Sequence, residues 1–143
     1  MPKPKGDKYP KELISIGDHI KKRRLDLGLT QSEVAYIIGT KSIDAVRNWE
    51  LGKGEPQIHQ IPEVIKFLGY IPIPVCFDTL GDKVKAFRIL RGLSHRTMGQ
   101  LLKVNGCTIG SWQQNEFLPN KKKLAELNRL FEITFSAYEG ILE

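Results

Sequence analysis

Two cysteines and three histidines are the side chains of this sequence best suited to bind a transition metal. They are Cys76, Cys107, His19, His59 and His95. A structural zinc site needs about four ligands, and these residues form neither a CxxC pair nor a histidine cluster. We therefore expect no metal and no cofactor. The two cysteines are predicted to be small buried apolar residues in a reducing compartment.

The stretch GKGEP, which begins at Gly52, has some likeness to a phosphate-binding loop. It lacks the strand-to-helix context and the Gly-Lys-Ser/Thr step that such a loop needs. The sequence also has no nucleophile-elbow motif and no pair of acids placed for catalysis. These features predict a protein without enzymatic activity and without a small-molecule ligand.

The charge balance favours a polyanionic partner. The 143 residues include 22 Lys and Arg against 16 Asp and Glu, which gives a formal net charge of +6. A basic excess favours nucleic acid, because each neutralised phosphate releases condensed counterions. The apolar share of 41% is enough for folded cores. The sequence has no signal peptide and no run approaching the roughly 18 apolar residues of a membrane span, so we expect a cytoplasmic protein with a basic flexible tail at residues 1–10.

The sequence contains an internal repeat. SIGDHIKKRRLDLGLTQSEVAYIIG, from Ser15, aligns with TLGDKVKAFRILRGLSHRTMGQLLK, from Thr79, at an offset of 64 residues. The offset then becomes 63, so copy one has an extra residue between Gly39 and Val46. Shared glycines, a tryptophan and a proline favour a true duplication over two unrelated helical segments. The identical pairs are Gly17–Gly81, Asp18–Asp82, Lys21–Lys85, Arg24–Arg88, Gly28–Gly92, Leu29–Leu93, Trp49–Trp112 and Pro56–Pro119.

Each copy is predicted to form four short helices, because capping residues and helix-ending glycines recur between stretches of helical periodicity. The second helix of copy one begins with a capping box at Thr30 and Glu33, of which copy two keeps only Ser94. The third helix of each copy is predicted to bury an apolar residue and a tryptophan spaced i and i+3. The other residues on which the predicted helix starts, helix ends and buried positions rest are the caps Ser15, Thr79 and Asn120, the glycines Gly28 and Gly92, the first-turn Pro62, and the pairs Val46–Trp49 and Ile109–Trp112.

The chain is thus predicted to be all-α, with a first domain at residues 11–70 and a second at residues 79–143. Residues 71–78 join the two domains and alternate apolar residues around Pro72 and Pro74. A flexible linker would instead be polar and rich in Gly and Ser. We predict a linker that packs against one or both domains and fixes the angle between them.

Copy one carries a specific set of residues around the turn between its second and third helices. A Gln is followed by a small residue four positions later, a Gly four positions further, and then a helix ending in Trp-Glu-x-Gly. From Ile16 to Tyr70 the sequence resembles the Cro/C1-type helix-turn-helix regulators. This resemblance implies two tandem lambda-repressor-like bundles of about four short helices each, with the third helix placed in the major groove of DNA. The matching residues are Gln31, Ala35, Gly39, Trp49, Glu50 and Gly52.

The resemblance implies roles for the residues of copy one. Gln31 would bond a phosphate and brace the recognition helix, and Lys53 would reach the DNA backbone. Arg47 suits guanine and Asn48 adenine, because each can bond a base edge through two hydrogen bonds. The extra residue in the turn leaves the groove-facing register open, Ser42 is also a candidate helix cap, and Asp44 is equally well explained as a solvated residue. The side chains expected on or near the groove-facing side are Ser42, Asp44, Arg47 and Asn48.

Copy two resembles the family more weakly, from Leu80 to Phe131, and mainly through the repeat. Its candidate recognition stretch has no cation and two glycines, each of which costs about 1 kcal/mol against alanine in a helix. The positively charged residues near it either hold phosphates or form a solvated face. The residues that depart from the motif are His95, Gly99, Lys103 and Gln113. The candidate recognition stretch comprises Asn105, Gly106, Cys107, Gly110, Ser111 and Gln114. The nearby positively charged residues are Lys83, Lys85, Arg96 and Lys121 to Lys123. Of these residues, His95, Arg96, Ser111 and Gln114 are the candidate DNA contacts.

Other residues are predicted to be structural. By resemblance, Arg24 and Glu50 form an ion pair that ties the first helix to the end of the recognition helix. Copy two keeps Arg88 but has the neutral Gln113 as its partner. Trp49 and Trp112 are expected in the two cores.

The sequence therefore predicts a sequence-specific transcription regulator that binds double-stranded DNA. Copy one is the expected main reader, and copy two an auxiliary unit that holds phosphates or forms a homodimer. Two alternatives use the same fold: a protein-interaction or dimerisation module, and an antitoxin that binds a toxin while regulating its own promoter.

Overall fold

The computed structural model describes residues 9–139, so residues 1–8 of the predicted tail lie outside it. The chain divides into two compact units, Met1–Ile73 and Pro74–Glu143, called unit 1 and unit 2 below. All regular elements of the described residues are helices, with no strand among them, which confirms the predicted all-α class.

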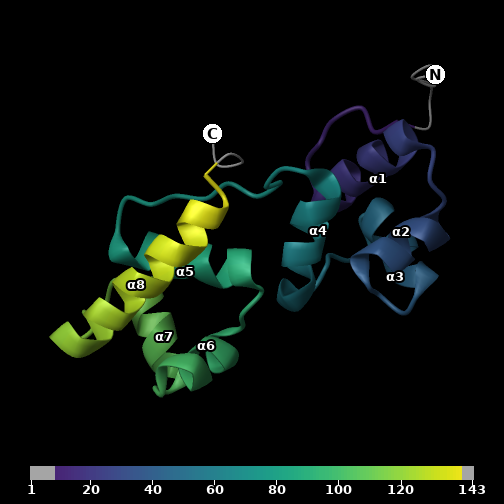
Figure 1. The fold of residues 1–143 in the computed structure, drawn as a ribbon. Coiled ribbons are helices and arrows are strands. Elements are labelled where there is room, and N and C mark those ends of the chain that lie inside the picture. The colour runs from purple at the N-terminus through teal and green to yellow at the C-terminus, as the bar shows by residue number, and fades with distance from the viewer. Residues whose placement is uncertain (1–8, 140–143) are drawn as a thin grey trace. The chain divides into compact units, whose positions relative to one another are not determined.

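Unit 1 is built from short helices that pack around α3 and α4 (Figure 1). Helix α3 contacts α1 and α2, and α4 also contacts α1 and α2. The bounds are α1 Ile16–Leu27, α2 Gln31–Ile38, α3 Ile43–Glu50, the 3-10 helix η1 Ile58–Gln60, and α4 Ile61–Leu68.

Unit 2 repeats this order with a longer last helix (Figure 1). Helix α7 packs against α5 and α6, while α8 packs against α5. The bounds are α5 Leu80–Arg91, α6 His95–Leu102, α7 Gly106–Gln113 and α8 Lys121–Ala137.

The helices begin where the capping residues predict. Thr30 and Glu33 form the expected capping box at the start of α2. Ser94 caps α6 by accepting from the Thr97 backbone N–H, and its hydroxyl also bonds that of Thr97 at 2.9 Å. At the start of α1, the backbone N–H of Ser15 donates to the Asp18 carboxylate at 3.0 Å, and this hydrogen bond is the main reason that the Asp18 pKa is lowered. Ser15, Thr79 and Asn120 likewise cap α1, α5 and α8. These contacts confirm the predicted helix starts.

The helix bounds of the two units keep the sequence offsets. Helices α5 and α6 follow α1 and α2 by 64 residues, whereas α7 follows α3 by 63. The extra residue therefore lies in the turn before α3, which spans residues 39–42, against 103–105 before α7. Gly39 ends α2 at φ 88°, and Lys103 ends α6 in the same left-handed region at φ 60°, a conformation less favourable for a residue with a Cβ.

Each unit has its own core. Val46 and Trp49 of α3 are buried in unit 1 beside Ile20, while Ile109 and Trp112 of α7 are buried in unit 2. The pairs spaced i and i+3 thus turn one side of the third helix inward, as predicted. The opposite side of that helix faces solvent.

A glycine lets the first helix of each unit approach the end of the third helix closely. A Cβ added at Gly17 would lie 1.7 Å from the carbonyl oxygen of Trp49, and one at Gly81 would lie 2.2 Å from that of Gln113. No side chain fits at either distance. These two glycines therefore set the distance at which α1 meets α3 and α5 meets α7.

The irregular segment that begins unit 2, before α5, packs against the last helix of the same unit. The Phe77 ring packs edge-on against Phe135 of α8, with ring centroids 4.9 Å apart.

The expectation of buried cysteines is wrong, because Cys76 and Cys107 are both free and exposed. Cys76 lies in this irregular segment, and Cys107 is in the first turn of α7, on the side away from Ile109 and the core.

Candidate nucleic-acid interface

The outward side of α3 carries the predicted groove-facing residues. Asp44, Arg47 and Asn48 are exposed, and none of their side chains has a hydrogen-bond or ion-pair partner within residues 9–139. Since Val46 and Trp49 fix the inward side, the helical repeat leaves these three side chains available to an external partner.

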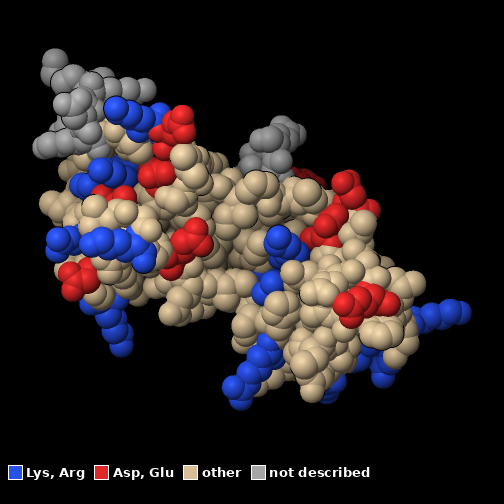
Figure 2. Space-filling view, turned by 180° about the vertical axis from the view of Figure 1, so that it is seen from behind, with Lys and Arg blue, Asp and Glu red and all other residues tan. Residues whose placement is uncertain are grey.

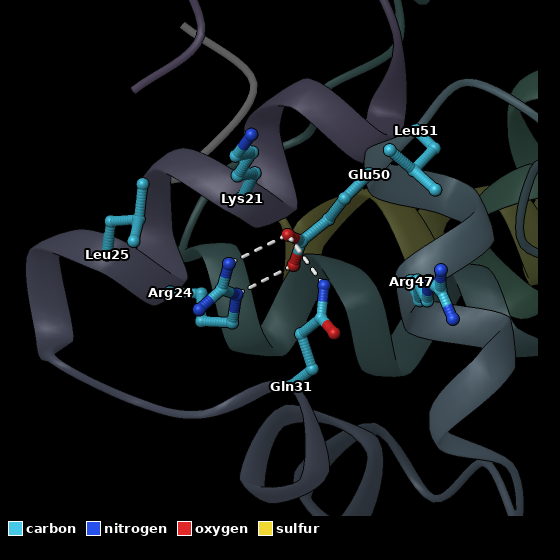
Figure 3. A pocket seen from close by; sticks show the side chains of 7 residues that line it. All are labelled: Lys21, Arg24, Leu25, Gln31, Arg47, Glu50 and Leu51. Carbon is cyan, nitrogen blue, oxygen red and sulfur yellow. Dashed lines mark hydrogen bonds and ion pairs between the residues drawn. The ribbon is translucent and has the colours of Figure 1, made fainter. Parts of the chain in front are cut away.

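A charged clamp holds the C-terminal end of α3 against α1 and α2 (Figure 3). The Arg24 Nε donates to Glu50 Oε2 at 2.7 Å, and Arg24 Nη2 donates to Glu50 Oε1 at 2.8 Å. Both side chains are largely buried, with 14% of Arg24 and 3% of Glu50 exposed. Arg24 Nη1 also donates to the Leu29 carbonyl oxygen at 3.1 Å. A bidentate pair with a third bond fixes the orientation of α3 as well as its position.

Gln31 completes this clamp from the first residue of α2. Its Nε2 donates to Glu50 Oε1 at 3.2 Å, which is the contact that a residue bracing the recognition helix would make (Figure 3). The side chain is half-buried, and its bond to the clamp is made by the amide nitrogen. Gln31, Arg24 and Glu50 are therefore brought together from three different helices.

At the start of α3, Ser42 does not make the capping hydrogen bond that the sequence had suggested for it. Ser42 occupies the N-cap position, but its side chain makes no capping hydrogen bond. The φ of −125° and ψ of 122° give an extended backbone there, and the backbone N–H of Ser42 instead bonds Thr40 Oγ1 at 3.4 Å. At the other end, the Lys53 backbone N–H bonds the Asn48 carbonyl oxygen at 2.8 Å, and Lys53 itself is exposed.

A cleft of about 430 Å³ opens beside the clamp. It is lined by Lys21, Arg24, Leu25, Gln31, Arg47, Glu50 and Leu51. Sequence reasoning did not assign Lys21 or Leu51 to the interface. Lys21 is one of the residues identical in the two copies, and Leu51 follows directly after α3; these are the signals that could have pointed to them.

In unit 2, the contacts that correspond to the clamp have a neutral residue, Gln113, at the end of α7. Arg88 Nε donates to Gln113 Oε1 at 2.9 Å, Arg88 Nη1 donates to the Leu93 carbonyl oxygen at 3.1 Å, and His95 Nε2 lies 3.2 Å from Gln113 Oε1. Arg88 is buried, and this burial lowers its pKa. Burial also lowers the pKa of His95; the nearby Arg88 charge acts in the same direction, and the bond to Gln113 opposes it.

The glycines of unit 2 allow α6 and α7 to approach each other. A Cβ added at Gly106 would lie 3.3 Å from the Arg96 backbone, and one at Gly99 would lie 2.6 Å from the Val104 carbonyl oxygen. Packing against α6 thus explains Gly106, one of the two glycines that looked unfavourable in the recognition stretch; the other, Gly110, would meet only His95 Cδ2 at 4.0 Å. Ser111 is half-buried, while Gln114 and Arg96 are exposed.

The charged residues do not mark the interface by themselves. On the face shown in Figure 2, Lys and Arg are spread over both units rather than gathered in one patch.

Among residues 9–139, no group of three or more His, Cys, Asp or Glu side chains is placed to hold a metal ion. None of the described helices is long and apolar enough to cross a membrane.

Residues 20–75 match the helix-turn-helix family model. This range takes in most of α1 and all of α2, α3 and α4, so it covers the clamp and the exposed side of α3. The match indicates a DNA-binding regulator in general terms. No significant match was found among curated proteins or among solved structures.

Proposed function

We propose that this protein is a sequence-specific transcription regulator that binds double-stranded DNA, with α3 of unit 1 placed in the major groove. The observation that carries the proposal is the combination of a rigidly clamped α3 with three unpaired polar side chains on its outward side. A helix that reads bases must be held in one orientation, because hydrogen bonds to base edges tolerate little displacement. The helix-turn-helix match over residues 20–75 supports the same function.

Within α3, we assign base recognition mainly to Asn48 and Asp44. Asn48 can bond adenine through two hydrogen bonds, and Asp44 can accept one from the amino group of cytosine. Asp44 lies in the first turn of α3, the part of a recognition helix that contacts base edges. Ser42 and Lys53, which lie before and after α3, are assigned to the groove edge and the DNA backbone.

Unit 2 is proposed as a second helix-turn-helix copy with an auxiliary role. It presents Ser111 of α7 and Gln114, the C-cap of that helix, instead of the charged and amide groups of α3. His95, Arg96 and the exposed Lys121 and Lys122 are the side chains that would hold phosphates. The Lys123 ammonium already donates to the Leu102 carbonyl oxygen at 2.6 Å and pairs with Glu126, so it is not assigned to DNA. Such contacts add affinity without selecting a sequence.

Self-association through unit 2 is the second candidate function. Phe117 and Leu118, which follow α7, are 66% and 80% exposed and line an open cleft of about 450 Å³ together with Cys107 and Ser111. Apolar side chains so exposed favour a protein contact over a DNA contact. If this surface joins two copies of the chain, Phe117→Ser should lower the molar mass measured by light scattering from dimer to monomer.

Selection of binding sites from random duplexes tests the DNA-binding proposal. The wild-type chain should enrich a defined site, Asn48→Ala should lose the preference at one base pair, and Ser111→Ala with Gln114→Ala should leave the selected site nearly unchanged. The expected cost of Asn48→Ala on the selected site is about 1–3 kcal/mol. Loss of specificity in the double variant alone would show that unit 2 is the reader.

A further inference from the structure

The cleft beside α3 contains more positive charge than its internal contacts use. Its walls include Lys21 and Arg24 from α1 and Arg47 from α3, against the single carboxylate of Glu50. Both Glu50 oxygens are already bonded, Oε2 by Arg24 and Oε1 by Arg24 and Gln31. The positive charges that remain are those of Lys21 and Arg47.

Neither of these two cations has an internal partner. No hydrogen bond or ion pair joins the Lys21 or Arg47 side chain to another residue within 9–139. In Figure 3, Lys21 and Arg47 lie on opposite sides of the Glu50 carboxylate, and dashed lines connect only Arg24 and Gln31 to it. The cleft is thus flanked by two free cations, while its acid is neutralised.

The position of Arg47 around α3 differs from that of the base-facing residues. With 3.6 residues per turn, Asp44 lies about 170° from the middle of the buried side that Val46 and Trp49 define. Arg47 and Asn48 each lie about 130° from that middle, but on opposite sides of Asp44. Glu50, and with it the cleft, is on the Arg47 side. Arg47 therefore faces the junction with α1, while Asn48 faces away from it.

We propose that this cleft binds the phosphate backbone of DNA through Lys21 and Arg47, and that Arg47 positions the protein instead of reading a base. The proposal rests on the proposed function and revises one of its residues, since the sequence had suggested guanine recognition by Arg47. Ammonium and guanidinium groups both form charge-assisted hydrogen bonds with phosphate oxygens. The clamp serves this site as well, because Arg24 and Gln31 prevent Glu50 from repelling the phosphate.

The test compares salt dependence with sequence preference. Fluorescence anisotropy titrations of a selected duplex and a random-sequence duplex of equal length would be run over a series of salt concentrations. Arg47→Ala and Lys21→Ala should each reduce the slope of log affinity against log salt by about one per bound chain. At roughly 0.15 M salt, that change corresponds to about a fivefold weaker binding of both duplexes. The ratio of the two affinities should stay unchanged.

Three further variants make the result interpretable. Lys66→Ala removes one positive charge from α4 of the same unit, where the side chain is 73% exposed, and should leave the slope unaltered. Arg47→Lys should restore most of the slope, because a phosphate accepts either cation. Asn48→Ala should lower the affinity ratio while keeping the slope. Since Arg47 is exposed, unchanged circular dichroism is expected for its variants.

Two results would overturn the proposal. A lower affinity ratio for Arg47→Ala would make Arg47 a base-reading residue, and an unchanged slope for both Arg47→Ala and Lys21→Ala would show that the cleft does not meet DNA. If the wild-type chain bound neither duplex, the proposed function itself would fail, which is a distinct outcome.

Discussion

The junction of the first, second and third helices is built from charged groups in unit 1 and from mostly neutral groups in unit 2. In unit 1, Arg24 meets a carboxylate, and in unit 2 Arg88 meets the amide of Gln113 at nearly the same distance. Each arginine also donates to the backbone carbonyl oxygen of the residue five positions later in its own unit, at 3.1 Å. The geometry of the junction is therefore retained although its electrostatics differ.

The third helix is held in the same way in both units, whichever side chains its outward side carries. Both α3 and α7 are fixed at the same end by a buried arginine and at the first helix by a glycine contact. They differ on the outward side, where α3 has a cation and amide and α7 has small residues. The same scaffold thus carries two different outward surfaces, which is why we propose DNA recognition for unit 1 and a different contact for unit 2.

The largest expected effect is the loss of the carboxylate in unit 1. Glu50→Ala leaves the Arg24 charge nearly buried without a counter-ion, and should lower the free energy of unfolding by about 3 kcal/mol. Gln113→Ala removes a neutral acceptor from Arg88 and should cost about 1–2 kcal/mol. Hydrogen exchange of the amides in α3 and α7 would report on each unit separately.

Equal and small losses of unfolding free energy in Glu50→Ala and Gln113→Ala would contradict the contrast between the charged and the neutral junction. They would mean that water replaces the Glu50 carboxylate at little cost. Lys66→Ala, which breaks an exposed pair with Glu63, is the matched control and should change stability by less than about 1 kcal/mol.

A second prediction concerns the feature that the two units share. Gly17→Ala and Gly81→Ala place a methyl group against a backbone carbonyl in each unit, so each should lower the free energy of unfolding by about 2 kcal/mol. Gly54→Ala, whose added Cβ would meet nothing within 4 Å, is the control and should be nearly neutral. Thermal unfolding of the three variants would check this; a neutral result at only one of Gly17 and Gly81 would show that the two junctions are not equivalent.

The smallest expected effect is a pH dependence in unit 2. Because burial lowers the His95 pKa in the folded chain, the unfolded chain takes up its proton first as the pH falls. The contribution of His95 is complete above the unfolded-state histidine pKa of about 6.5, and it is lost as the pH falls from there through the lowered pKa of the folded chain. His95→Gln, which copies the residue of unit 1, should therefore reduce the loss of thermal stability between pH 8 and pH 5.

His19 shows a lowered pKa for the same main reason, so the variant should retain part of the wild-type pH response. An identical response in the wild-type chain and in His95→Gln would contradict the assignment to His95.

The local sequence was enough to predict the helices, because caps, terminal glycines and buried spacings act within a few residues of each other. Thr30 with Glu33 and Asn120 before α8 are examples in which one short motif predicts a helix start that the structure contains. The offset of the repeat also limited the extra residue to the region between Gly39 and Val46, and the structure places it in the turn before α3. The general tendency of cysteine to be buried did not predict the exposure of Cys107, because the helical repeat of α7 turns this residue about 200° away from the buried Ile109.

The sequence by itself determined the fold class and the helix order, since residue type and spacing decide both. The contrast between a charged and a neutral junction followed from the family resemblance together with the replacement of Glu50 by Gln113 in copy two. The tertiary structure alone decided which side of α3 Arg47 faces and that Lys21 of α1 lies at the same cleft. It also decided why Gly17 and Gly81 must be small. These facts depend on how helices distant in sequence approach one another, and no pattern within a single helix contains that distance.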